Sequence, residues 1–216
     1  MSDDIEEVVG PDVTIRFEAK RCIHSRHCVL SRPDVFVPNV KGEWIHPEAA
    51  TADEVAELAH NCPSGAIQYI RHDGKPAEAP PKVNLVEVRE NGPLAFHGEF
   101  ALAGHGTFLR ATLCRCGASK TKPFCDNSHT AKDFKATGEP PTKETQPLTK
   151  RDGAVTIRPA EDGPLIVAGN VEVVTGTGRT VVRCLKAAFC RCGGSKTKPF
   201  CDGTHLTIDF QAPAGE

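Results

Sequence analysis

Residues 114–129 read CRCGASKTKPFCDNSH, and residues 190–205 read CRCGGSKTKPFCDGTH. Eleven residues of this block, in the runs CRCG and SKTKPFC, recur unchanged. Each copy has the spacing C-x-C-x8-C-x3-H, which offers three thiolates and one imidazole to a metal. We therefore predict two metal sites of the same kind, one in each copy.

The spacing within each copy favours metal ligation over disulfide bonds. Two cysteines separated by one residue rarely reach the dihedral angle of about 85–100° that a disulfide prefers, whereas both side chains can converge on one ion. The Gly, Ser, Thr and Pro residues before Cys125 and Cys201 are typical of a loop that wraps around a small object. A helical turn that starts near Asp126 would place Cys125 and His129, four residues apart, on one side.

Two kinds of metal suit three cysteines and one histidine. Tetrahedral zinc takes this set of ligands in structural sites. A 2Fe-2S cluster in which imidazole replaces one of four thiolates also takes it, as an intermediate between the plant type and the Rieske type. The spacing alone leaves both metals open.

Beyond the ligands, both copies resemble the CDGSH iron–sulfur domain of the mitoNEET family. The motif of that family is C-x-C, a Ser or Thr three residues later, and then Pro-x-Cys-Asp-Gly-Ser-His. The matching residues are Ser119, Ser195, Pro123 and Pro199. Two departures spare the ligands: Asn127 stands at the Gly position, where Asn is the best substitute for a positive φ, and Thr204 replaces Ser but keeps a hydroxyl. The resemblance covers most of residues 92–210.

This resemblance implies two 2Fe-2S clusters, each with an inner iron held by two cysteines and an outer iron held by Cys and His near solvent. The implied ligands are Cys114, Cys116, Cys125 and His129 for the first cluster, and Cys190, Cys192, Cys201 and His205 for the second. Reduction makes such a cluster more negative and favours protonation of the imidazole, so electron and proton gain would be coupled. Mild acid would compete with iron for the ring. We expect six cations to offset the cluster charge: Arg115, Lys120, Lys122, Arg191, Lys196 and Lys198.

A third cysteine group lies ahead of the repeats. Residues 22–28 read CIHSRHC and residues 62–67 read CPSGAI, which resembles a single-cluster bacterial ferredoxin with C-x2-C-x2-C and a later Cys-Pro. Ser25 stands where the middle ligand belongs. Thr51 and Glu54 form a capping box that predicts a helix over 51–60 leading into Cys62. This resemblance covers residues 13–71.

The three cysteines of this group, Cys22, Cys28 and Cys62, allow three interpretations. We first expect a 3Fe-4S cluster, which lacks the iron that the middle cysteine would hold. The alternative is a 4Fe-4S cluster whose odd iron is held by Ser25, His24, His27 or a small molecule. In the third interpretation the three cysteines are structural residues of a protein in a reducing cytoplasm.

We predict an α+β protein of three modules: a ferredoxin-like domain at 1–80 and two CDGSH domains at 83–138 and 151–216. Pro-rich linkers around 73–81 and 138–150 separate them. Each later module should open with a strand, at 83–88 or 154–157, and contain a hairpin that turns at 104–106 or 176–178. Since the CDGSH family forms dimers, we expect the tandem copies to form a pseudo-twofold pair within a monomer, 92–138 against 163–216.

Charge and composition narrow the function. The formal net charge is −2 and no basic cluster occurs, so we expect no nucleic-acid partner. No apolar run reaches the roughly 20 residues of a membrane span, and Met1–Asp4 begins no targeting segment, so we expect a cytoplasmic, bacterial protein. We expect Cys184 to be a buried apolar side chain. His46, His60, His72, His97 and His105 should be surface or structural residues.

Three functional classes fit these features. The first is electron transfer between the clusters and an unknown redox partner, and the second is a cluster carrier or redox sensor that donates to an apo-acceptor. The third is a zinc-binding interaction module. We find no nucleophile with a base and no cofactor loop, so we expect no enzyme.

Overall fold

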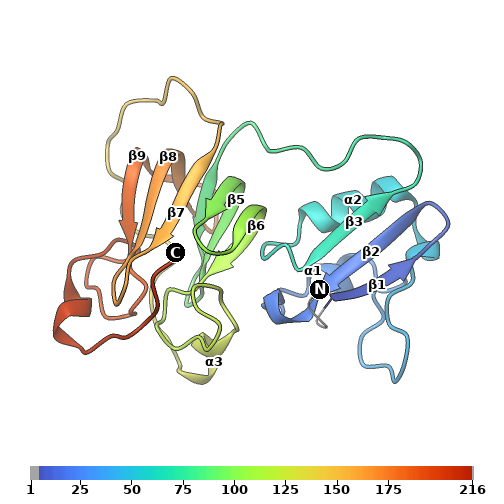
Figure 1. Ribbon diagram of the computed structural model, residues 1–216, viewed down its shortest axis with the longest axis horizontal. Coiled ribbons are helices and arrows are strands. Elements are labelled where there is room, and N and C mark those ends of the chain that lie inside the picture. The colour runs from blue at the N-terminus through green and yellow to red at the C-terminus, as the bar shows by residue number, and fades with distance from the viewer. Residues whose placement is uncertain (1–4, 216) are drawn as a thin grey trace. The chain divides into compact units, whose positions relative to one another are not determined.

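The computed structural model describes residues 5–215, so the polar start at Met1–Asp4 lies outside the described residues. The chain divides into two compact units, Met1–Ala79 and Pro80–Glu216. Each unit has its own sheet and its own hydrophobic core, and helices are few and short, so the fold is mixed α+β (Figure 1). No helix within residues 5–215 has the length and apolar composition that crossing a membrane requires.

The first unit is a three-stranded antiparallel sheet with two helices. Its strands β1 (Ile5–Val9), β2 (Val13–Glu18) and β3 (Ile67–Arg71) pair in that order. Between β2 and β3 lie α1 (His27–Ser31) and α2 (Ala52–His60), with 3-10 turns at Ala19–Arg21 and Pro47–Ala49. The pattern of alternate apolar residues in β2 buries Val13 and Ile15 under α2 and Phe36, which closes the core.

The predicted helix that leads into the third cysteine is confirmed. Thr51 caps α2: its hydroxyl accepts from the Glu54 N–H, and the Glu54 carboxylate accepts from the Thr51 N–H at 2.8 Å. This capping box satisfies two N–H groups that the first helical turn leaves unpaired. Because α2 ends at His60, two residues before Cys62, the helix positions Cys62 in the hydrophobic core.

The second unit is one six-stranded sheet built from two similar halves. The first half supplies β4 (Leu85–Val88), β5 (Leu94–Leu102) and β6 (Gly106–Leu113). The second half supplies β7 (Val155–Pro159), β8 (Leu165–Thr175) and β9 (Thr180–Phe189). These strands confirm the predicted opening strands and hairpin turns. The second copy has five more residues than the first between its Gly-Pro-Leu and its first cysteine, and they lie in its longer hairpin. A short helix follows each half: α3 (Ser128–Ala131) and the 3-10 helix η3 (Thr204–Thr207).

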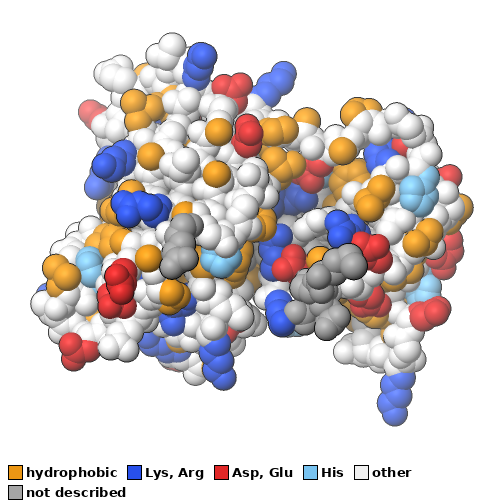
Figure 2. Space-filling view, in the orientation of Figure 1, with side chains coloured by type: hydrophobic (Ala, Val, Ile, Leu, Met, Phe, Trp, Pro, Cys, Tyr) orange, Lys and Arg blue, Asp and Glu red, His pale blue; other side chains and the backbone are white. Residues whose placement is uncertain are grey.

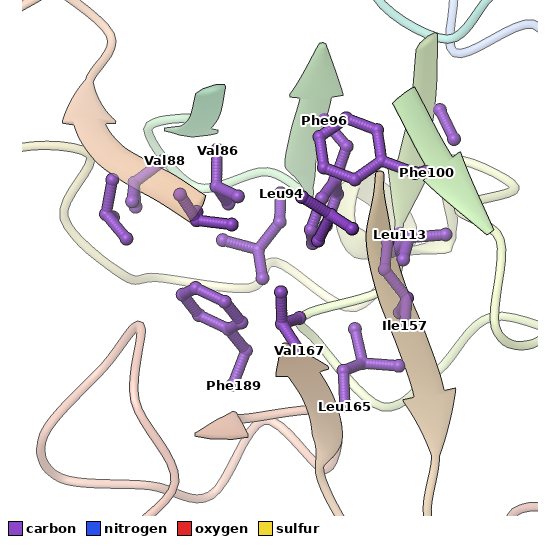
Figure 3. Close-up of a cluster of buried hydrophobic side chains, with 14 of the residues drawn as sticks. Val86, Val88, Leu94, Phe96, Phe100, Leu113, Ile157, Leu165, Val167 and Phe189 are labelled. Atoms are coloured by element: carbon purple, nitrogen blue, oxygen red, sulfur yellow. The ribbon is translucent and has the colours of Figure 1, made fainter. Parts of the chain in front are cut away.

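Strands of the two halves pair with one another. β4 pairs antiparallel with β5 of its own half and parallel with β8 of the other half. β7 likewise pairs antiparallel with β8 and parallel with β5. One core therefore serves both halves, as the ring of Phe96 lies edge-on to Phe100 and to Phe189 from β9 (Figure 3). The two cysteine loops are anchored at the ends of β6 and β9 by this common core.

Candidate metal centres

In the first repeat the four expected ligands meet as two pairs. The Sγ atoms of Cys114 and Cys116 lie 3.7 Å apart. Cys125 Sγ lies 3.4 Å from Nδ1 of His129. The three cysteines are buried and His129 is partly exposed, so the Cys/His pair is the one nearer to solvent.

The second repeat has the same two pairs at the same distances. Cys190 and Cys192 have their Sγ atoms 3.7 Å apart, and Cys201 Sγ lies 3.4 Å from His205 Nδ1. Two sulfurs on one tetrahedral metal, bonded at about 2.3 Å, lie about 3.7 Å apart, and a sulfur and a nitrogen about 3.5 Å apart. Each pair is thus spaced as two ligands of one metal. Within residues 5–215, no three His, Cys, Asp or Glu side chains gather about a single metal position.

The turn that joins Cys125 to His129 differs from the helical turn predicted for it. Helix α3 begins at Ser128, so Cys125 lies outside the helix. Asn127 has a φ of 68° in the left-handed region and reverses the chain, and Gly203 does the same in the second copy with a φ of 86°. Asn and Gly are the residues that adopt this conformation at least cost, which explains the departure from the family motif at this position.

A serine and an aspartate hold each loop in shape. Ser119 Oγ donates to the Phe124 carbonyl at 2.7 Å, and Asp126 accepts from the Lys120 N–H at 2.8 Å and the Ser128 N–H at 3.0 Å. The bonds recur in the second copy, where Ser195 and Asp202 take these roles. Each loop is therefore closed by its own polar side chains.

Backbone N–H groups face the cysteine sulfurs. In the first loop Ala118 donates to Cys116 and Asn127 donates to Cys125, each at 3.4 Å. Gly194 and Gly203 supply the equivalent N–H groups in the second loop. Such bonds stabilise sulfur that carries negative charge.

The pKa values of the first-domain ligands are shifted in both directions: a hydrogen bond from Cys114 lowers the pKa of Cys116 to about 6, whereas those of Cys114 and Cys125 rise. Burial raises the pKa of the Cys125 thiol to about 12. A hydrogen bond with Cys116, aided by burial, raises the pKa of Cys114. Burial lowers the pKa of His129, which favours the neutral ring that a metal requires. Metal uptake must therefore release protons from the thiols, and acid must reverse it.

The three cysteines of the first unit border one cavity. Cys22, Cys28 and Cys62 line a hollow of about 320 Å³ together with Ser25, and apolar residues such as Trp44 form most of its wall. Burial raises the pKa of Cys22 and of Cys28, and the charge of a neighbouring thiolate adds a smaller increase: Cys62 acts on both, and Cys22 acts on Cys28. The loop between Cys22 and Cys28 is tightly wound, since His24 and Arg26 both have φ in the left-handed region, at 53° and 65°.

Comparisons with known families agree with these three sites. Residues 91–130 and 162–206 match the family described as iron-binding zinc finger, CDGSH type. Residues 8–72 match the family described as divergent 4Fe-4S mono-cluster. The chain carries two CDGSH domains and one 4Fe-4S mono-cluster domain. Both resemblances noted in the sequence are thereby confirmed. No curated protein matches the chain.

The arginine between the first two cysteines of each CDGSH domain is buried rather than placed beside solvent. Arg115 is 0% exposed and Arg191 1%. The guanidinium of Arg115 donates to the carbonyls of Gly92, Arg89, Ala136 and Thr137. That of Arg191 donates to the carbonyls of Gly163, Ala160, Ala212 and Pro213. Each arginine therefore ties the cysteine loop to the turn before β5 or β8 and to the segment after the ligand histidine.

The cysteine loops of the two CDGSH domains touch one another. A Cβ on Gly117 would lie 2.3 Å from the Cys192 carbonyl oxygen, and a Cβ on Gly193 would lie 2.3 Å from the Cys116 carbonyl oxygen. Both glycines have positive φ, +81° and +82°, so only glycine meets both demands. Arg115 is moreover close enough to attract a thiolate at Cys190. Sequence reasoning missed these contacts because nothing local marks a glycine that faces another loop.

The other sulfur and imidazole groups lie apart from the three centres. Cys184 is half-buried on β9 and packs against the core, in line with its predicted apolar role. His72 bonds to Thr14 at 3.0 Å, and His60 bonds to Tyr69 at 3.0 Å. His105 lies edge-on to the ring of Phe124. These histidines have structural partners, as predicted.

Proposed function

We propose that this protein is an electron carrier that holds a 2Fe-2S cluster in each CDGSH domain and a third cluster in the mono-cluster domain. The pairing of the ligands carries the proposal. A single zinc ion needs all four ligands around one point. Two pairs per domain, each spaced for one metal, instead suit two bridged irons, the inner one on the Cys/Cys pair and the outer one on the Cys/His pair.

The residues around each pair suit a site that gains an electron. A bound 2Fe-2S cluster supplies one-electron storage with a potential set by charge, hydrogen bonds to sulfur and solvent exposure. The N–H groups of Ala118 and Asn127 would stabilise negative charge on the sulfurs of the first domain. His129 is partly exposed, so its ring can exchange a proton with water when electrons arrive.

For the mono-cluster domain we propose a cluster held by Cys22, Cys28 and Cys62 in the cavity that they border. The description of the matched family favours 4Fe-4S over the 3Fe-4S cluster that three cysteines first suggest. All three candidate side chains for the fourth ligand, His24, Ser25 and His27, line the same cavity. Ser25 stands at the sequence position of the missing middle cysteine. Because a hydroxyl ligates poorly until it loses its proton, this iron would be the weakest point of the cluster.

We further propose that the two CDGSH domains form a pseudo-twofold pair, the family dimer in a single chain. The reciprocal strand pairings of β4 with β8 and of β7 with β5 support it. So does the reciprocal contact of Gly117 with Cys192 and of Gly193 with Cys116. The pair would act as a monomer that receives electrons from a redox protein and delivers them to another, rather than as an enzyme. All ten cysteines lie within residues 5–215 and none forms a disulfide, which suits a reducing cytoplasm.

The first test is the colour and metal content of the purified protein. We expect a red-brown protein with iron and sulfide, whose visible absorbance dithionite bleaches. A colourless protein that contains zinc would disprove the proposal. Electron paramagnetic resonance of the oxidised protein then decides the third cluster: a signal indicates 3Fe-4S, and its absence indicates 4Fe-4S, because the 2Fe-2S clusters give a signal only after reduction.

The second test uses acid. Burial places the pKa of His129 below its ordinary value of ~6.5, so protons should displace iron from the ring only in mild acid and not at neutral pH. The double variant His129→Cys, His205→Cys should keep its 2Fe-2S absorbance at pH 5, where the wild type loses it within the same time. His105→Ala, outside the ligand pairs, should behave as the wild type. Equal acid loss in the double variant would exclude ligation by these histidines.

A further inference from the structure

The two CDGSH domains differ in charge beside matched ligands. Three residues after the ligand His129 stands Lys132, and three residues after His205 stands Ile208. Figure 2 shows Lys and Arg side chains around α3, whereas hydrophobic and His side chains lie at the surface over η3, at the lower left. Other cations of the loops occur in both copies, as Lys120 has a counterpart in Lys196 and Lys122 in Lys198.

Lys132 reaches back to the inner ligand pair of its domain. Its ammonium donates to the carbonyl oxygen of Cys116 at 2.9 Å. It also attracts a thiolate at Cys116, a smaller effect on the pKa of this thiol than the hydrogen bond from Cys114. Lys135, the other lysine without a basic counterpart, lies 2.5 Å from Asp133 and is offset by that carboxylate.

In the second domain an apolar side chain takes this place. Ile208 Cδ1 lies over Gly194, 2.9 Å from where a Cβ would stand, and Gly194 replaces Ala118 of the first domain. The absence of that one methyl group makes room for the isoleucine and for Thr204, whose Cγ2 would lie 2.8 Å from the same Cβ. An isoleucine can neither donate to Cys192 nor offset charge. The two substitutions thus belong together, and position 208 brings no positive charge to the second centre. Lys143 lies near this loop, but its ammonium is placed over the ring of Phe200, 4.6 Å from the ring centre.

We propose that Lys132 raises the reduction potential of the first CDGSH centre above that of the second, so that electrons collect in the first domain. This inference rests on the proposed 2Fe-2S clusters. Reduction adds one negative charge to a centre, and an ammonium bonded next to its ligand stabilises that charge. In the exchange, one electron leaves the second centre, which is oxidised, and enters the first, which is reduced, with no bond made or broken.

A difference in exposure acts in the opposite direction but is smaller. Cys201 is more exposed than Cys125, and water favours the more negative, reduced state. The difference in exposure concerns part of one side chain. Lys132 instead places a full positive charge at hydrogen-bond distance from the carbonyl oxygen of Cys116. The contact between the loops at Gly117 and Gly193 gives electrons a short path between the domains.

The test is an anaerobic redox titration of the full chain with dithionite, followed by absorbance and electron paramagnetic resonance. The wild type should show two separate 2Fe-2S waves. Lys132→Ile should lower the higher wave by about 59 mV, a tenfold change in the ratio of reduced to oxidised centre. Ile208→Lys should raise the lower wave by a similar amount. Lys135→Met is the control and should move neither wave by more than a third of that.

The outcomes separate this inference from the proposed function. One unsplit wave in the wild type, or an unchanged higher wave in Lys132→Ile, would overturn the role of Lys132 while leaving the 2Fe-2S assignment in place. A protein with no 2Fe-2S wave would overturn both. Thermal unfolding of each variant, matched to the wild type, excludes a shift that comes from partial loss of the fold.

Discussion

At the scale of single residues, the buried arginines support a specific expectation. Arg115 donates to four carbonyls from two separate segments, and burial lowers its pKa only to about 10, so it stays charged at neutral pH. Arg115→Lys keeps the charge but cannot reproduce the planar fork of donors. Because buried carbonyls lose bonds to a charged donor, we expect the free energy of unfolding to fall by about 3 kcal/mol in chemical denaturation.

The control for this variant is Arg158→Lys, an exposed position on β7. It should change the free energy of unfolding by no more than about 0.5 kcal/mol. Similar values for the two variants would show that the carbonyl bonds of Arg115 add nothing to stability.

The ligands could be found from sequence, but the role of these arginines could not. The four ligands of each domain lie within 16 consecutive residues, so the spacing C-x-C-x8-C-x3-H was sufficient to identify them. An arginine in a loop of Gly, Ser and Lys has the composition of a solvated surface. Its burial depends on carbonyls about 20 or more residues away, such as those of Gly92 and Thr137, and local pattern carries no information on them.

At the scale of elements, local sequence signals predicted the helix cap and the turns, but they did not predict which strands pair. The capping box at Thr51 and the turns between β5 and β6 and between β8 and β9 are set by nearby residues, and the structure contains them. The exchange of partners between β4 and β8 joins residues far apart, and many other registers would suit the same apolar alternation. The β1–β2–β3 sheet was not predicted, although β2 does carry alternating apolar residues.

The capping box offers a test of how α2 supports its cluster ligand. Thr51→Ala removes the hydroxyl that accepts from the Glu54 N–H, and we expect the mono-cluster domain to lose about 1 kcal/mol. Thr51→Ser, the matched control, keeps the hydroxyl and should stay within about 0.5 kcal/mol of the wild type. Thermal unfolding with absorbance of the third cluster measures both. A Thr51→Ala protein as stable as Thr51→Ser would mean that the cap contributes little in this context.

At the scale of the whole chain, duplication has produced two centres that share a core but differ in their surroundings. Both domains have the same ligands, the same buried arginine, and the same serine and aspartate that hold the cysteine loop in shape. The differences gather after the ligand histidine, where Lys132 and Ile208 stand. A sequence comparison of the two copies reveals those differences, but only the structure relates Lys132 to Cys116.

The close packing of the two CDGSH domains leads to the last prediction, which concerns the glycine at their contact. Gly117→Ala would bring a Cβ to 2.3 Å from the Cys192 carbonyl oxygen at a φ of +81°. Gly153→Ala has the same kind of strained backbone, with a φ of +90°, but nothing within 4 Å of its Cβ. Left-handed strain costs about 1 kcal/mol in each variant, and only Gly117→Ala must also push the loops apart. We therefore expect Gly117→Ala to lose at least about 2 kcal/mol more than Gly153→Ala in thermal unfolding, and to lose iron from both domains. Equal losses in the two variants, with iron retained, would show that the cysteine loops do not depend on each other.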